Sequence, residues 1–379
     1  MLYGVAIASV GGPLALAALN VPQALADVRD SSGLLVAIGI ALFAFPTIVW
    51  RRYAERVASP GGLSAYVQAA AGTTTARVQA VIWIVSYFLY LPATVAYVVA
   101  ELLPVAFRRI ARAEPWLMLA IPLAIVVGVA AWRTGALAAI GLLAVAQVLV
   151  VGWLAAAPAT HALPRVNSFV ASGSASELTL GAVTVSLFFL CSSLPLYLGG
   201  ELRRPTTLLR RALPVSVAVG GACVLAAAVA LARVPARLES GPFPGWAVAE
   251  AVGGHSLAVA VATGTALSIL SLVALEFVAL TRLVPAMFPV KPDTAYLGVA
   301  GAFLAGSAIS LVNPGRFYDL ALPPMLVALF VSEAIVFAVF PRFRRRFATL
   351  RTSDVVAATV ATGLMGAGVW LALRSSGAS

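Results

Sequence analysis

The chain has 379 residues, of which 61% are hydrophobic and only 10% are charged. Soluble domains carry about 25% charged residues, and one of this size has no core that could bury so much apolar surface. The composition excludes an ordinary soluble protein and predicts an all-α integral membrane protein that lies in lipid.

The formal net charge of +11 does not indicate a nucleic-acid-binding protein. The basic residues stand in short clusters between apolar stretches, as arginines that flank membrane helices do. The expected surroundings are therefore the bilayer, and nucleic acid is not an expected partner. The sequence leaves the oligomeric state open.

Apolar stretches long enough to cross a bilayer recur along the whole chain. A membrane-crossing helix needs about 20 mostly apolar residues. We predict eleven transmembrane helices, at residues 3–25, 33–50, 78–105, 115–132, 135–157, 178–200, 212–232, 256–281, 294–312, 317–340 and 353–373.

The basic residues also predict how the chain is oriented. Most of the 25 lysines and arginines fall in segments that are cytoplasmic if the N-terminus is inside. Cytoplasmic loops of membrane proteins carry such an excess. We expect a multi-pass protein of the cell membrane with a cytoplasmic N-terminus and, after eleven spans, an external C-terminus.

The first span contains a sequence that breaks helices. Residues 9–13 read Ser-Val-Gly-Gly-Pro. Paired glycines weaken a helix, and Pro13 lacks an amide donor but is well suited to begin a new helix. We predict a half-helix, an unwound stretch and a second half-helix.

The sixth span contains a similar interruption. Residues 191–195 read Cys-Ser-Ser-Leu-Pro, with small polar side chains before a proline. Broken helices at corresponding positions of two halves point to the binding site of a transporter. Freed amides can hold an anionic group and freed carbonyls an ammonium group or a cation. The alternative is two ordinary proline kinks. The predicted substrate-binding residues from the two breaks are Ser9, Val10, Gly11, Gly12, Cys191, Ser192 and Ser193.

Three further stretches resemble those of the amino acid–polyamine–organocation superfamily of permeases. Residues 59–67 read Ser-Pro-Gly-Gly-Leu-Ser-Ala-Tyr-Val, and residues 200–205 read Gly-Glu-Leu-Arg-Arg-Pro. Residues 280–289, at the end of the eighth span, read Leu-Thr-Arg-Leu-Val-Pro-Ala-Met-Phe-Pro. Over residues 1–340, these stretches occur in the same sequence relative to the predicted spans as in these permeases.

The resemblance implies a leucine-transporter-type fold. It implies a five-helix repeat at 1–157, an inverted second repeat at 178–340, and one additional peripheral helix at 353–373. It further implies secondary active transport of amino acids or related amines by alternating access, with the substrate between spans one, three, six and eight. A proton gradient, a sodium gradient or exchange would drive the transport.

The sequence departs from the family pattern at three places. Pro13 stands where family members often have an amide that faces the substrate carboxylate. The span at 135–157 contains no lysine, although proton-coupled members often carry one there. Eleven spans are predicted instead of twelve. These departures put carboxylate capture and lysine-based proton coupling in doubt.

Charged groups in a bilayer are candidates for function, because placing one at the centre costs at least about 2.5 kcal/mol. Glu276 is the deepest carboxyl in the predicted eighth span, and we expect it to carry a coupling proton or to pair with an arginine of another helix. Ser268 and Ser271 lie three apart on the same span and could bind sodium with carbonyls of span one. Serines also bond to their own helix. No cofactor is expected apart from a coupling H⁺ or Na⁺, and no metal site.

Two further groups complete the predicted site. Tyr87 and Tyr90 fall on neighbouring faces of the third span and could line the pocket together with Trp83. The alternative is that these aromatic side chains face lipid or pack between helices. Glu201, Arg203 and Arg204, after the sixth span, are expected to form a gate or a structural salt bridge.

Three other functions compete with uptake. A membrane enzyme needs metal ligands or a nucleophile with a base, and the predicted spans hold no such set. We therefore do not expect an enzyme. A membrane subunit that kept the fold without transporting, and an exporter or exchanger of a small metabolite, stay open as alternatives.

Overall fold

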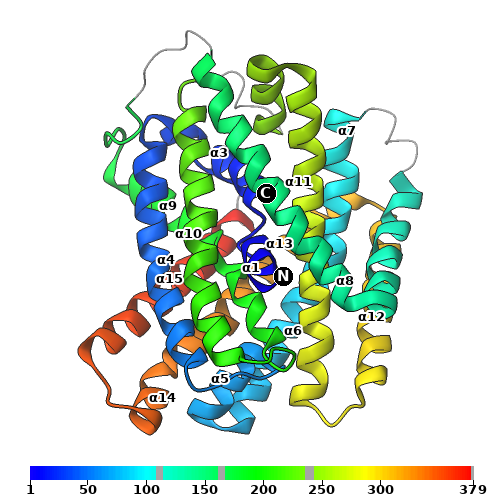
Figure 1. Ribbon diagram of the computed structural model, residues 1–379, viewed down its shortest axis with the longest axis vertical. Coiled ribbons are helices and arrows are strands. Elements are labelled where there is room, and N and C mark those ends of the chain that lie inside the picture. Colours follow the sequence, from blue (N-terminus) through cyan, green and yellow to red (C-terminus); the bar gives the residue numbers. More distant parts are fainter. Residues whose placement is uncertain (108–113, 161–166, 235–242, 377–379) are drawn as a thin grey trace.

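The computed structural model describes residues 1–107, 114–160, 167–234 and 243–376, and this part of the chain consists of helices joined by short loops (Figure 1). The first half contains α1 (Leu2–Ala8), α2 (Pro13–Ala15), η1 (Leu16–Asn20), α3 (Val21–Ala24), η2 (Ala26–Ser31), α4 (Ser32–Ala54), α5 (Gly62–Ala71), α6 (Thr73–Ala96), η3 (Tyr97–Leu102), α7 (Leu103–Ala106), α8 (Glu114–Ala156) and η5 (Ala157–Thr160). The second half contains α9 (Ala175–Leu187), η6 (Leu190–Leu198), α10 (Pro205–Leu231), α11 (Pro244–Met287), α12 (Pro292–Ser310), α13 (Pro314–Ala338), α14 (Phe340–Phe347) and α15 (Thr352–Ser376).

Nine helical stretches among the described residues are long and apolar enough to cross a membrane. They are Leu2–Ala24, Ala26–Ala54, Thr73–Ala106, Glu114–Ala156, Ala175–Leu198, Pro205–Leu231, Pro244–Met287, Pro314–Phe347 and Thr352–Arg374. The 43-residue α8 leaves helical geometry at Trp132 and so contains two of the predicted spans. With α12 on the predicted span at 294–312, each of the eleven predicted spans coincides with a helix.

The first span lies at the centre of the bundle. In its most apolar window 78% of the residues are buried, against 39% in α8. It packs against α8, α10 and α11, and Figure 1 shows α1 surrounded by longer helices. A central helix that is covered on all sides must be apolar all round, which explains why its sequence shows no polar face.

The predicted interruptions of spans one and six are both present. Helix α1 ends at Ala8, and a new helix begins at Pro13 after Gly11 and Gly12, whose φ angles are +99° and +71°. Only glycine adopts such angles without strain. In span six, α9 ends at Leu187, and the 3-10 helix η6 follows from Leu190.

Two of the family-like stretches pack against each other at the end of the molecule that carries α5 and α14 (Figure 1). A Cβ atom on Gly62 would lie 2.5 Å from the ring of Tyr197, and one on Gly200 would lie 2.6 Å from Pro60. The glycines are therefore required by close approach between the start of α5 and the end of η6.

In helix α15, at the predicted additional span, 39% of the residues of the most apolar window are buried, the same share as in α8. Helix α15 packs along α13 and also contacts α4 and α9. Its Gly368 lies so close to the ring of Phe330 in α13 that a Cβ atom would come within 2.9 Å.

Candidate functional site

The two interruptions meet inside the bundle. A Cβ atom on Gly11 would lie 2.8 Å from the carbonyl oxygen of Phe188, just after the end of α9. The unwound part of span one therefore lies directly against the break in span six. Each break contributes backbone that does not belong to a regular α-helix.

Not every predicted residue of the first break faces the meeting point. Ser9 is buried, and its hydroxyl donates to the carbonyl of Ala6 at 2.8 Å, within its own helix. Val10 is buried against Gly220 of α10. Gly12 lies against Ser268 of α11, where a Cβ atom would come within 2.1 Å of the hydroxyl oxygen.

Ser268 links three spans. Its hydroxyl accepts from the amide of Ala15 at 3.4 Å and donates to the side-chain carbonyl of Gln147 in α8 at 2.8 Å. Ser271, three residues further along α11, is also buried. The side chains of both serines thus lie inside the bundle, and that of Ser268 lies near the break in span one.

The three predicted residues of the sixth span have different neighbours. The thiol of Cys191 lies 3.9 Å from both the hydroxyl of Tyr87 and the carboxyl of Glu276. The hydroxyl of Ser192 donates to the carbonyl of Phe189 at 2.7 Å, and that of Ser193 donates to Glu333 at 3.2 Å.

A cavity of about 480 Å³ begins at the meeting point of the two breaks. Of the predicted residues, Gly11, Tyr90 and Cys191 line it. It extends toward the end of the molecule that carries α3 and α7, because Asn20 and Gln23 also belong to its wall. A cavity of this size matches the range of small-molecule sites.

Most of the cavity wall was not predicted. Tyr97 and Tyr318 stack with their ring centroids 4.9 Å apart, and both line the cavity. Thr94 and Thr184 add hydroxyls, and α15 contributes Gly368, Leu371 and Ala372. Thr94 and Tyr97 follow Tyr90 at helical spacing, so a search along that face of the third span could have found them.

Two fully buried carboxyls lie one helical turn beyond the cavity wall. Leu272 and Leu329 line the cavity, and Glu276 and Glu333 follow them by four residues on α11 and α13. Residues four apart on a helix share a face. Among the described residues, neither glutamate takes part in the ion pairs of the structure.

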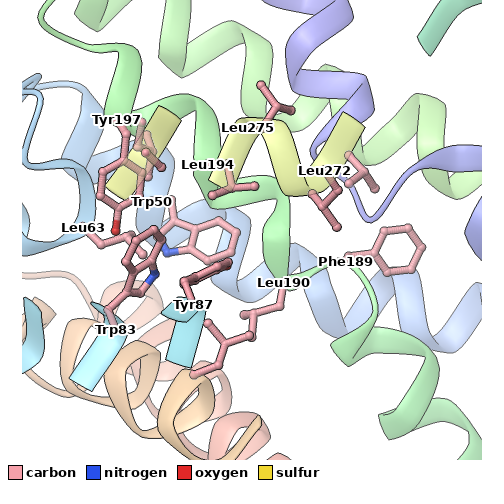
Figure 2. Close-up of a cluster of buried hydrophobic side chains, with 14 of the residues drawn as sticks. Trp50, Leu63, Trp83, Tyr87, Phe189, Leu190, Leu194, Tyr197, Leu272 and Leu275 are labelled. Carbon is pink, nitrogen blue, oxygen red and sulfur yellow. The ribbon is translucent and has the colours of Figure 1, made fainter. Parts of the chain in front are cut away.

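An aromatic layer separates the cavity from the α5 end. The ring of Trp83 lies 4.0 Å from that of Tyr87 and 4.7 Å from that of Tyr197, measured between centroids. Figure 2 shows these rings gathered beside Trp50. All four side chains are buried, so the layer closes this side of the bundle.

Beyond the aromatic layer, Glu201 forms an ion-pair bridge. Its carboxylate lies 2.6 Å from the guanidinium of Arg282 and 3.7 Å from that of Arg133. Arg203 and Arg204, which the sequence grouped with Glu201, are exposed. The partners of Glu201 thus come from α11 and α8, far away in the sequence, instead of from its neighbours in the chain.

Comparisons with known proteins support the fold. No protein-family model matches the sequence, and no curated protein matches it. A manganese transporter of Eremococcus coleocola, solved in complex with an aromatic bis-isothiourea substituted compound, aligns with a TM-score of 0.66 and 12% identity, over 97% of this chain and 86% of that one. A histidine-to-alanine mutant of that transporter aligns with a TM-score of 0.61 and 13% identity, over 98% and 92%.

A transporter of the nucleobase-cation-symport-1 family, solved in a closed conformation with bromovinylhydantoin bound, also aligns. Its TM-score is 0.52 at 13% identity, over 98% of this chain and 91% of that one. At such identities the likeness concerns the fold. The chain is an all-helical membrane protein with the leucine-transporter-type fold that these transporters share.

Proposed function

We propose that this protein is a secondary active transporter of amino acids or related amines and a member of the amino acid–polyamine–organocation superfamily. The substrate would lie at the unwound parts of spans one and six and cross the membrane by alternating access. The superfamily assignment draws on the three family-like stretches together with the shared fold.

One observation carries the proposal: the cavity begins where the two broken helices touch. Gly11 and Cys191, one from each break, line it. A cavity that ends on irregular backbone inside a membrane bundle is a common arrangement at transporter substrate sites. The tyrosine and threonine hydroxyls of its wall could orient a small polar solute.

The two ends of the bundle differ in the way that alternating access requires. The α5 end is closed by the ring contacts of Trp83 and by the bridge at Glu201. The cavity instead reaches toward the opposite end, where the exposed Gln23 forms part of its wall. With a cytoplasmic N-terminus, which the basic residues favour, the closed end is cytoplasmic.

The candidate for proton coupling is Glu276. A carboxyl in the membrane interior can alternate between a charged and a neutral form. Sodium coupling is the second candidate, because the hydroxyl of Ser268 lies against the break in span one. Ser268, however, already bonds with both Ala15 and Gln147, which favours the proton.

A metal substrate is less well supported, although one protein of similar fold is described as a manganese transporter. Hard divalent cations favour carboxylate and other oxygen ligands. Residues 9–13 in the span-one break carry no carboxylate, and the described residues contain no group of three or more His, Cys, Asp or Glu side chains that could hold a metal ion.

Export, exchange and uptake would use the same site, so the geometry favours none of them. A membrane subunit that kept the fold without transporting would have no use for a cavity at the two breaks. The cavity therefore favours a transporter over such a subunit.

The test is binding followed by transport. Purified protein is screened by thermal shift against amino acids and amines, and the compounds that raise Tm are then tested for uptake into proteoliposomes with an imposed proton or sodium gradient. Ligands stabilise the native state in proportion to ln(1 + [L]/Kd). A folded protein that binds and transports no amine or amino acid would contradict the proposal.

A further inference from the structure

Glu276 has an unused hydrogen-bonding atom in the membrane interior. Its side chain is fully buried, and one carboxyl oxygen receives the thiol of Cys191 at 3.9 Å. The other oxygen, Oε2, has no hydrogen-bond partner among the described residues. A buried carboxyl oxygen without a donor is costly, and this cost points to a group that arrives from outside the chain.

The route to this oxygen leads from the cavity. Cys191 and Tyr90 both line the cavity, and both lie close enough to Glu276 to interact with it electrostatically. Leu272, one turn before Glu276 on α11, lines the cavity as well. Cys191, which lines the cavity and contacts the carboxyl of Glu276, therefore connects the cavity wall to that carboxyl.

The same site offers little to a carboxylate. In the span-one break, the amides of Ser9, Val10 and Gly12 already donate to backbone carbonyls, so that within residues 9–12 of the described structure only the amide of Gly11 has no backbone acceptor. Pro13 has no amide hydrogen, and the amide of Ala15 donates to Ser268. No lysine, arginine or histidine is among the residues that line the cavity.

We propose that Glu276 binds the ammonium group of the substrate, and that the preferred substrate is an amine without a carboxylate. This inference rests on the proposed transport function and narrows its substrate class. The ammonium group donates a hydrogen bond to Oε2 of Glu276. It also donates to Oε1 in place of the thiol of Cys191. An ammonium–carboxylate contact out of water is among the stronger hydrogen bonds in proteins.

The carboxyl can hold either a proton or an ammonium group, and the two exclude each other. Amine affinity is therefore expected to fall as the pH falls, because protonation of Glu276 removes the negative charge that attracts the amine. The titratable groups around Glu276 are Cys191 on η6, Tyr87 and Tyr90 on α6, and the more distant Glu333 on α13. Neither thiol nor phenol is ordinarily charged at neutral pH or below.

The experiment compares amino acids with the amines that remain when the carboxyl group is removed. The pairs are phenylalanine with phenethylamine, leucine with isopentylamine, and lysine with cadaverine. Thermal shift gives the affinity of the full-length protein in detergent, and uptake into proteoliposomes tests transport. We expect at least one amine to bind about tenfold or more tightly than its amino acid, with weaker binding at pH 5.5 than at pH 7.5.

Two variants locate the effect. Glu276→Gln keeps the shape of the side chain and removes its charge, so it should weaken amine binding at least about tenfold and abolish the pH dependence. Glu333→Gln is the matched control. It changes an equally buried carboxyl whose Oε2 also has no hydrogen-bond partner among the described residues, but whose other oxygen contacts Ser193 instead of a cavity-lining residue. Amine affinity should stay within about threefold.

The possible failures are distinct. If the wild-type protein binds and transports amino acids but not their amines, the ammonium assignment is wrong and the transport function stands. If folded wild-type protein binds neither class, the transport proposal itself fails. Unchanged amine affinity in folded Glu276→Gln protein also overturns the assignment. If that variant does not fold, the paired ligands and their pH dependence in the wild type decide the question.

Discussion

The guanidinium of Arg282 lies 2.6 Å from the carboxylate of Glu201 and thereby joins the end of α11 to the segment that follows η6. Arg133 approaches the same carboxylate oxygen at 3.7 Å. Because η6 belongs to the interrupted span six, the bridge holds the end of that span against two other spans at the α5 end.

Glu201→Gln should loosen this end of the bundle. The ion pair is partly exposed, so its loss should change the balance between closed and open forms by about 1 kcal/mol or less, a few-fold in population. The reporter is a single cysteine introduced as Ser59→Cys, beside Gly199, in protein whose two native cysteines have been replaced. The measurement is the rate at which a membrane-impermeant maleimide labels this cysteine. Glu55→Gln, an exposed carboxylate after α4, is the control and should leave the rate unchanged. Equal labelling rates in the Glu201→Gln and Glu55→Gln variants would show that the ion pair of Glu201 does not keep this end of the bundle closed.

Asp354→Asn should lower stability strongly. The side chain of Asp354 is fully buried and pairs with Arg52 and Arg344, each at 3.1 Å, which joins α4, α14 and α15. Removing one partner of a buried ion pair costs about 3–5 kcal/mol, because the remaining charges lose their compensation. Thermal unfolding in detergent should show a clear fall in Tm.

The control for Asp354 is Asp293→Asn. Asp293 is also in the first turn of a helix, α12, but it is exposed. Both substitutions therefore remove a similar interaction between a carboxylate and the helix dipole. Only Asp354→Asn also removes the buried ion pairs with Arg52 and Arg344. A similar, small change in Tm for both variants would count against the structural role of the Asp354 pairs.

Gly12→Ala should reduce transport strongly. Gly12 has a φ angle of +71°, and an added Cβ atom would lie 2.1 Å from the hydroxyl oxygen of Ser268. Gly72→Ala separates the two effects, because its φ is +89° but nothing lies within 4 Å of an added Cβ atom. The strained backbone alone costs of the order of 1–3 kcal/mol. Gly12→Ala should therefore reduce uptake and Tm more than Gly72→Ala, and adding Ser268→Gly should restore part of the loss. Equal effects would show that the contact with Ser268 is unimportant.

Transport should proceed equally well in sodium and in choline buffer. The hydroxyl of Ser268 is held by Ala15 and Gln147, so Ser268→Ala should cost stability, about 1–3 kcal/mol, without changing an ion requirement. Ser307→Ala, at a buried serine of α12 whose hydroxyl has no partner among the described residues, should cost less. A sodium requirement that Ser268→Ala shifts to higher sodium concentrations would instead place the coupling ion at Ser268.

The break in span one shows how far local sequence rules reach. Gly11, Gly12 and Pro13 are consecutive, and their intrinsic backbone preferences are enough to end one helix and begin another. The same rules explain the agreement of the predicted spans with the helices, because in lipid each apolar stretch must satisfy its own backbone. The predicted division between the spans at 115–132 and 135–157 appears as a departure from helical geometry at Trp132.

Most of the cavity wall follows from no local rule. Tyr97 stacks on Tyr318, and α15, expected as a peripheral helix, supplies Gly368, Leu371 and Ala372. Glu201 was expected to form a gate or a structural salt bridge with Arg203 and Arg204, but these arginines are exposed, and Arg282 and Arg133 pair with Glu201 instead. Contacts between residues so distant in the chain depend on how whole helices pack. The periodicity of one helix does not show how the neighbouring helix is rotated about its axis or how far it is shifted along the membrane normal.

The amino-acid sequence by itself therefore determined that this protein lies in a membrane, where its helices run and where two of them break, since hydrophobicity and backbone freedom act within a few residues. Only the tertiary structure decided that the breaks touch at Gly11 and Phe188, that a cavity opens there, and that Glu276 lies one turn beyond its wall. Those relations depend on the simultaneous packing of several spans, whose contacting residues are far apart in the chain.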